Sequence, residues 1–113
     1  MASNQVVVLR SGPGTSEAEG ALGLAQALLD RGGVLVLALL QDAVLLALKN
    51  GELPAQQRSR GLLERGAQCV YLAEDLAMRG FMSDQAVSGC SPVTYEELID
   101  VLLADGARVA GAF

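Results

Sequence analysis

The chain has 113 residues, of which 51% are apolar and 19% are charged. So much apolar surface excludes intrinsic disorder, and the length predicts a single domain over residues 1–113. The net charge of −5 argues against direct binding of nucleic acid, because an acidic surface repels the phosphate backbone. The sequence has no His, which excludes Ser-His-Asp triads, His acid–base catalysis and almost every catalytic zinc site.

The N-terminal residues carry no basic segment followed by an apolar stretch, so we expect no signal peptide. The most apolar run, residues 34–40, is too short to span a bilayer, which needs about 20 residues. Two cysteines without a secretion signal predict reduced thiols in the cytoplasm. Two cysteines without His also cannot complete a four-ligand zinc site within one chain, and we predict no metal, no cofactor and no membrane partner.

The first half of the chain alternates strand and helix patterns. Residues 5–10 hold a continuous apolar, mostly β-branched run, which predicts a strand buried on both faces. After a loop, Ser16 and Glu19 form a potential capping box for a helix that ends at Gly32 and Gly33. Residues 34–40 predict a second buried strand. Asp42 is the expected cap of a short helix over residues 43–49.

The second half continues the alternation. A short helix is expected over residues 58–65, followed by a strand at 67–73 and a helix at 74–79. Residues 81–93 look irregular, with a brief strand at 90–93. Thr94 and Glu97 form another potential capping box, and the elements that follow are a helix ending at Gly106 and a last strand over residues 108–113.

This alternation predicts an α/β sandwich with a mostly parallel sheet. Ligands of such sheets bind beyond the carboxyl ends of the strands, which here are residues 11–15, 41–42 and 74–75. The loop that holds Gly12, Gly14 and Thr15 precedes a helix, where free N–H groups and the helix dipole favour an anion. The alternative, which we favour, is a tight strand-to-helix turn, because the loop matches neither the dinucleotide-binding nor the P-loop pattern.

Three carboxylates follow the predicted strands: Asp42, Glu74 and Asp75. Carboxylates gathered in one cleft can shift each other's pKa and act as acids, bases or ligand contacts. The alternative is that they only complement the N-terminal dipoles of their helices. Both interpretations predict that these side chains lie at one edge of the sheet.

The two cysteines are expected to differ. Cys69 lies inside a predicted strand, where an apolar environment raises a thiol pKa and makes the thiol inert. Cys90 lies in the polar segment Ser-Gly-Cys-Ser-Pro, which predicts an exposed, flexible loop. An exposed thiol can carry sulfur or be oxidised, so Cys90 is the candidate catalytic residue.

Three stretches in the expected order resemble the DsrE/DsrF/DsrH (TusD/TusC/TusB) family of small sulfur-relay proteins. Residues 34–51 resemble its apolar strand, its Asp-Gly-Val turn and a short helix. Residues 70–80 resemble the strand, acidic turn and Arg-Gly ending of the DsrH/TusB branch. Residues 94–103, leading to 108–110, resemble its closing helix and strand.

The resemblance implies a three-layer α/β/α sandwich with about five strands. It further implies a cytoplasmic protein that assembles as a homo-oligomer, or as a hetero-oligomer with related subunits. Its other expected partners are sulfur-transfer proteins, which pass persulfide sulfur towards tRNA thiolation or sulfur oxidation. The high apolar content also favours an oligomer.

Two features depart from the family pattern. Ala43 stands where the family turn has Gly, and neither cysteine aligns with an active cysteine of the family. Three interpretations remain open: a non-catalytic or regulatory subunit of a sulfur-relay assembly, a persulfide carrier that uses Cys90, and a small-molecule or anion-binding protein that uses the Gly12–Gly14 loop. We rank them in that order.

Overall fold

The computed structural model describes residues 4–112. Residues 1–3 and residue 113, the last residue of the predicted final strand, lie outside this range. The elements in chain order are β1 (Asn4–Leu9), α1 (Ser16–Asp30), β2 (Val34–Leu39), the 3-10 helix η1 (Gln41–Ala47), α2 (Pro54–Glu64), β3 (Gln68–Leu72), α3 (Ala73–Met78), the 3-10 helix η2 (Ser83–Gln85), β4 (Cys90–Val93), α4 (Tyr95–Leu103) and β5 (Arg108–Ala112).

The strands form one sheet of five strands in the order β4-β3-β2-β1-β5. Each neighbouring pair is parallel, so the sheet over the described residues is wholly rather than mostly parallel. The longest ladder joins β1 to β2, from the pair Asn4 and Val34 to the pair Leu9 and Leu39. The α/β fold predicted from the alternating pattern is therefore confirmed.

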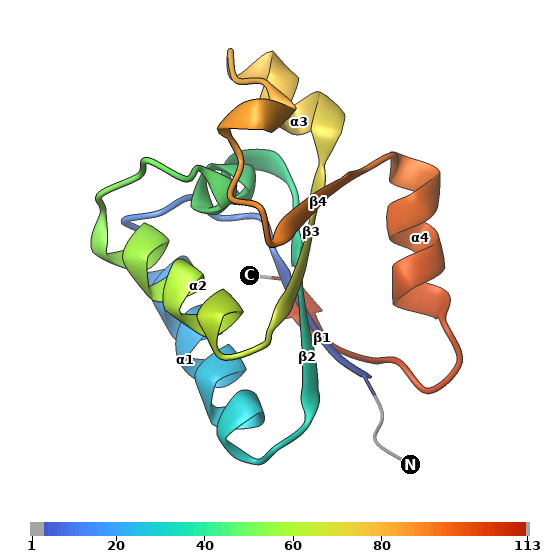
Figure 1. Cartoon of the computed structure of the whole chain (residues 1–113). Helices are drawn as coiled ribbons and strands as arrows, with labels where there is room; N and C mark the ends of the chain where they lie inside the picture. Colours follow the sequence, from blue (N-terminus) through green and yellow to red (C-terminus); the bar gives the residue numbers. More distant parts are fainter. Residues whose placement is uncertain (1–3, 113) are drawn as a thin grey trace.

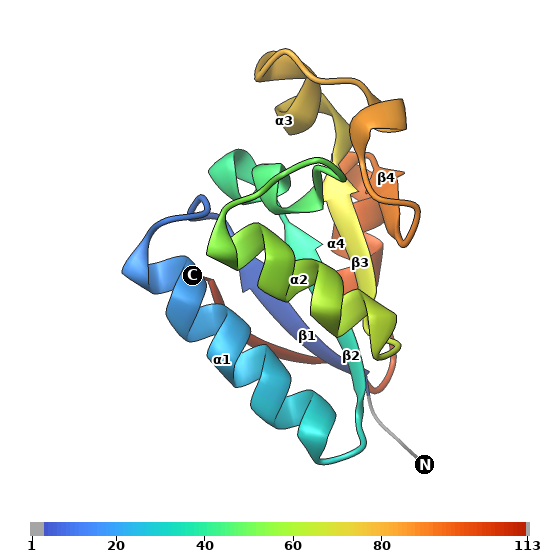
Figure 2. The ribbon, with the colours of Figure 1, turned by 60° about the vertical axis from the view of Figure 1, so that its left-hand side comes forward.

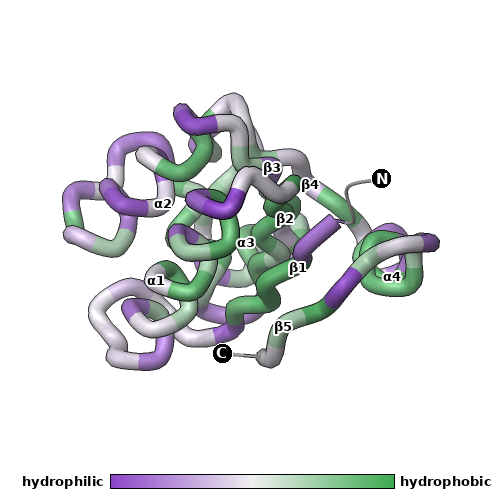
Figure 3. Tube along the Cα trace, turned by 90° about the horizontal axis from the view of Figure 1, so that it is seen from below, coloured by the Kyte–Doolittle hydropathy of each residue, from purple (hydrophilic) through white to green (hydrophobic). Residues whose placement is uncertain are grey.

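Helices cover both faces of this sheet. Figure 1 shows α1 and α2 on one side and α4 on the other, and Figure 2 shows α1 and α2 side by side in front of the strands. The larger core lies under α1 and α2 and includes Val7, Leu9 and Leu37, whereas Val6 and Val36 belong to a smaller core under α4. Both faces are buried, which is why β2 and residues 6–9 of β1 are continuous apolar runs. Figure 3 shows this apolar layer between the helices.

Two helix starts differ from the prediction. The cap of α1 is Thr15 rather than Ser16, because Thr15 has extended backbone and its Oγ1 accepts a hydrogen bond from Ala18 N at 3.1 Å. The predicted α4 capping box is confirmed: Thr94 Oγ1 accepts from Glu97 N at 3.1 Å, and the Glu97 carboxylate accepts from Thr94 N at 2.9 Å. The helix α2 begins at Pro54, earlier than predicted, because Pro suits the first position of a helix.

The predicted role of Asp42 as a helix cap is wrong. The segment after β2 is a 3-10 helix whose N-cap is Leu40, and no side chain caps it. Asp42 instead accepts hydrogen bonds from Arg79. None of the helices among residues 4–112 is long and apolar enough to cross a membrane.

Candidate functional site

The carboxyl ends of β1, β2 and β3 bring three of the predicted site residues together. A Cβ placed on Gly12 would lie 3.2 Å from the Cβ of Asp42, so the two loops are in close contact. Asp75 Oδ2 accepts a hydrogen bond from Gln41 N at 2.6 Å. Gly12, Asp42 and Asp75 therefore meet at one edge of the sheet, as the parallel topology predicts.

Arg79 also lies at this edge, although the sequence pattern did not predict it as a site residue. Its Nε and Nη2 donate to the same oxygen, Asp42 Oδ1, at 2.9 and 2.7 Å. Its Nη1 donates to the backbone carbonyl of Asp75 at 2.9 Å. Asp42 is therefore paired with a cation rather than placed against another carboxylate, and this pairing favours a structural role for it. The Arg-Gly ending of residues 70–80 contained the only sequence signal for Arg79.

Gln41, in the turn after β2, has a positive φ of 52°. It is the one non-glycine residue with a positive φ among the described residues. Such a conformation is uncommon for a residue with a side chain. The Asp75 carboxylate binds the N–H of this residue, so the start of α3 holds the strained turn in place. This contact accounts for Asp75 without any ligand.

The remaining predicted binding residues are spread along the same edge. Thr15 Oγ1 donates to Gly12 O at 2.8 Å and also caps α1, so its hydroxyl serves the turn itself. Gly14 is exposed and has φ of 95°, which explains the glycine. Glu74 is exposed. Ligand binding by Gly12, Gly14, Thr15, Asp42, Glu74 and Asp75 stays a prediction.

The environment of Cys90 differs from the prediction. Cys90 is the first residue of β4 and is only 7% exposed, so the expected exposed loop is wrong. The strand β4 pairs with β3, and the alternation of the strand turns Cys90 inward while Ser91 faces solvent. Pro92 is tolerated because β4 is an edge strand. The predicted brief strand at 90–93 is confirmed.

Cys69 and Cys90 lie side by side. They are register partners in β3 and β4, and both belong to the larger core. Cys69 is 2% exposed, as its position in a strand predicted. A hydrogen bond with the Cys90 thiol, burial and the charge of the neighbouring sulfur together raise the pKa of Cys69 well above its ordinary value. The protonated thiol of Cys69 is therefore favoured at neutral pH.

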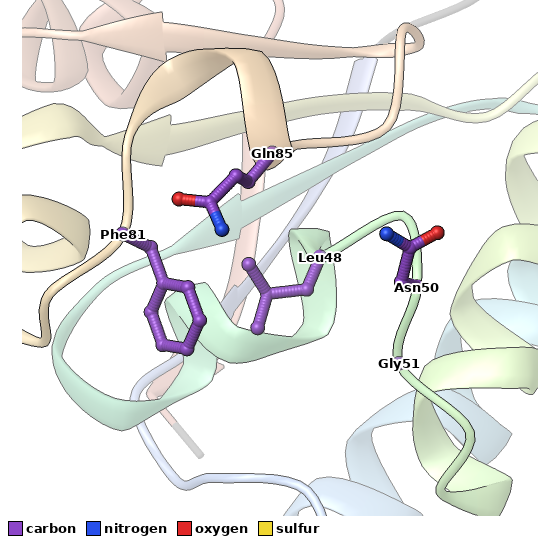
Figure 4. Close-up of a pocket in the computed structure, with 5 residues that line it drawn as sticks. All are labelled: Leu48, Asn50, Gly51, Phe81 and Gln85. Atoms are coloured by element: carbon purple, nitrogen blue, oxygen red, sulfur yellow. The ribbon is translucent and has the colours of Figure 1, made fainter.

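Two of the pockets border the segments between η1 and β4. Figure 4 shows the first, of about 180 Å³, lined by Leu48, Asn50, Gly51, Phe81 and Gln85. The second, of about 330 Å³, is lined by Arg60, Leu63, Glu64, Val87, Ser88 and Gly89. The first is smaller than an ordinary ligand site, and the second borders the start of β4. Neither is lined by a predicted binding residue.

Arg60, which lines the second pocket, links α2 to the segment that follows η1. Arg60 Nη2 donates to Gly51 O at 2.6 Å, and its Nη1 donates to Leu48 O at 3.2 Å. The segment 47–49 in turn pairs with 85–87, through Val87 N to Ala47 O at 2.7 Å and Lys49 N to Gln85 O at 3.0 Å. These bonds position the loop that leads into Cys90. Among the described residues no three His, Cys, Asp or Glu side chains are grouped so that they could hold a metal ion.

The fold defines the general class of the protein, an α/β sandwich with a parallel five-stranded sheet. The family model of DsrH-like proteins matches residues 15–106, and the chain belongs to that family. It is thus a sulfur-relay protein at the level of its family, whose members work in complexes with related subunits, as the sequence resemblance indicated.

A solved structure supports the fold. The ychN protein from E. coli superposes with a TM-score of 0.79 over 97% of this chain and 100% of that chain, at 23% sequence identity. At this identity the likeness concerns the fold alone. No curated protein sequence matches the chain.

Proposed function

We propose that the chain is a non-catalytic subunit of a cytoplasmic sulfur-relay assembly. The observation that supports this role is the burial of both thiols: Cys69 is 2% and Cys90 is 7% exposed. Transfer of sulfur between proteins requires the thiolate of one protein to attack a persulfide of the other. A sulfur atom on either buried side chain is poorly placed for such an attack.

The surface is compatible with a subunit that acts through its contacts. Met78, the last residue of α3, is 80% exposed, and Met82, four residues further along the chain, is 70% exposed. Tyr95 and Leu103 are exposed on α4. Exposed methionines and aromatic residues are typical of protein interfaces, because they adapt to a partner surface. The role of related subunits as partners rests on these side chains and on the family.

Loading with sulfur tests this proposal. The native protein is incubated with a cysteine desulfurase and cysteine at neutral pH, and its mass is measured intact. We expect no added sulfur. The matched control is Ser88→Cys, which places a thiol at an exposed position two residues before Cys90. This variant should take up one sulfur at the new thiol, because an accessible thiolate is the acceptor.

Rapid persulfide formation on Cys90 of the native protein would overturn the proposal. The chain would then be a carrier, which is the second interpretation of the sequence. Uptake by the Ser88→Cys variant shows in the same experiment that the donor system is active, so a negative result with the native protein is informative.

A further inference from the structure

The helix α4 carries an apolar row that lies outside both cores. Tyr95, Ile99 and Leu103 are spaced by four residues, so they follow one another along the same side of the helix. Tyr95 is 59% and Leu103 is 77% exposed, whereas Leu98 belongs to the smaller core. Figures 1 and 3 show α4 standing apart from α1 and α2. The apolar row is therefore open to a partner.

An acidic row runs directly beside the apolar row. Glu96 and Asp100 each follow a member of the apolar row by one position, and both are exposed. Carboxylates four residues apart on a helix repel each other. The ion pairs found over residues 4–112 all join arginines to carboxylates outside α4. The acidic row thus has no cation of its own within the part of the chain that the structure describes.

The stability of the helix does not account for the charge at its far end. A carboxylate stabilises the first turn of a helix, where Glu96 and Glu97 lie, because the dipole is positive there. Asp100 lies in the last turn and Asp105 follows two residues after Leu103, where the dipole is negative. No basic residue occupies this last turn. The two aspartates therefore disfavour the helix, and a cation from outside would offset that cost.

We propose that α4 docks a helix of a different protein, whose contact face is apolar and bordered by Lys or Arg. The apolar row forms the centre of the contact, and the acidic row selects a basic partner over an acidic one. A second copy of this chain, packed through its own α4, would set like charges against each other. That the partner is another subunit rests on the proposed function; the charge of its contact face rests on α4.

A designed helical peptide probes this surface. It carries leucines at spacings of three and four residues, lysines beside them and a fluorescent label whose anisotropy reports binding to the native protein. We expect binding, and replacement of the lysines by glutamates should weaken it at least about tenfold. The affinity for the lysine peptide should fall as the salt concentration rises, because exposed charges are screened.

Matched leucine variants locate the apolar part of the contact. Leu103→Ser should weaken binding of the lysine peptide about tenfold, because it removes an apolar side chain from the centre of the contact. Leu53→Ser is the control, because Leu53 is also exposed but precedes α2. It should leave the affinity unchanged. Both side chains project into solvent, so both variants should fold.

Matched charge variants locate the acidic part. The double change Glu96→Gln and Asp100→Asn should weaken binding of the lysine peptide about fivefold, because two partly screened charge pairs are lost. The double change Glu52→Gln and Glu64→Gln removes the same net charge at exposed positions outside α4. This control should keep the native affinity, which separates a local contact from attraction by the net charge.

Equal binding of the lysine and glutamate peptides, binding of neither, or full binding by Leu103→Ser overturns the proposal. So does a dimer of the native protein that Leu103→Ser dissociates in sedimentation, since a second copy would then cover α4. None of these results depends on the thiols. Sulfur loading by the desulfurase therefore tests the non-catalytic role separately.

Discussion

Arg79 and Asp42 are joined by two hydrogen bonds to one carboxylate oxygen, at 2.9 and 2.7 Å, across 37 positions of the chain. The pair connects the end of α3 to the turn after β2, and Arg79 also binds the Asp75 carbonyl. The Arg79 side chain is 26% exposed and that of Asp42 is 67% exposed. The pair is thus partly screened by water, and its contribution to stability is modest.

Arg79→Ala should lower the free energy of unfolding by about 1 kcal/mol, since it removes a screened ion pair and one bond to a carbonyl. Urea unfolding measures the change. Arg79→Lys should recover only part of it, because an ammonium group cannot bind both partners with the geometry of a guanidinium. Equal stability of the Ala and native proteins would show that the pair is not structural.

A buried amide holds the segment between η1 and α2. Gln56 is 6% exposed; its Oε1 accepts from Leu53 N and its Nε2 donates to Leu45 O, both at 3.0 Å. Gln56→Leu leaves both backbone groups without a partner, and we expect a loss of about 2 kcal/mol in the free energy of unfolding. Gln57→Leu is the matched control on an exposed neighbour and should change stability by less than about 0.5 kcal/mol. A similar loss in both variants would contradict this role of Gln56.

The parallel sheet could be predicted because burial on both faces leaves a signal in each strand by itself. β2 is apolar throughout and β1 is apolar from Val6 to Leu9, and the capping box at Thr94 and Glu97 depends only on residues three apart. Such local patterns need no knowledge of the remaining chain. The meeting of Gly12, Asp42 and Asp75 followed from topology, because parallel strands end at one edge.

The environment of Cys90 could not be predicted in the same way. Its neighbours Ser, Gly and Pro are typical of a loop, and its burial depends on the pairing of β4 with Cys69 and its flanking residues in β3. The Asp42–Arg79 pair is likewise a contact between distant segments. The sequence pattern placed Asp42 at a helix start, but the N-cap of the 3-10 helix is Leu40, and the Asp42 carboxylate binds Arg79 instead.

Two glycines allow a matched test of backbone conformation. Gly20 lies within α1, and an added Cβ would meet nothing within 4 Å. Gly20→Ala should raise the free energy of unfolding by about 0.5–1 kcal/mol, because alanine favours the helix and restricts the unfolded chain. Gly14→Ala should lower it by about 1 kcal/mol, because φ is 95° there. Thermal unfolding of both variants measures the difference, and changes of the same sign would contradict it.

The raised pKa of Cys69 predicts a loss of stability in alkaline solution. The Cys69 thiol of the folded protein stays protonated, through its hydrogen bond with Cys90 and its burial, at pH values where the unfolded chain has begun to ionise. The unfolded chain then binds fewer protons than the folded protein, so the free energy of unfolding falls with rising pH. The contribution is complete below the ordinary thiol pKa and is lost as the pH rises towards the raised value.

Urea unfolding at neutral pH and at increasing alkaline pH measures this dependence. Cys69→Ala removes the titrating group, so its stability should fall less steeply over the same range, even if the variant is less stable at neutral pH. Comparison of slopes rather than of absolute stabilities separates ionisation from the loss of packing. Identical slopes for the native protein and Cys69→Ala would show that the thiol of Cys69 titrates alike in the folded and unfolded states.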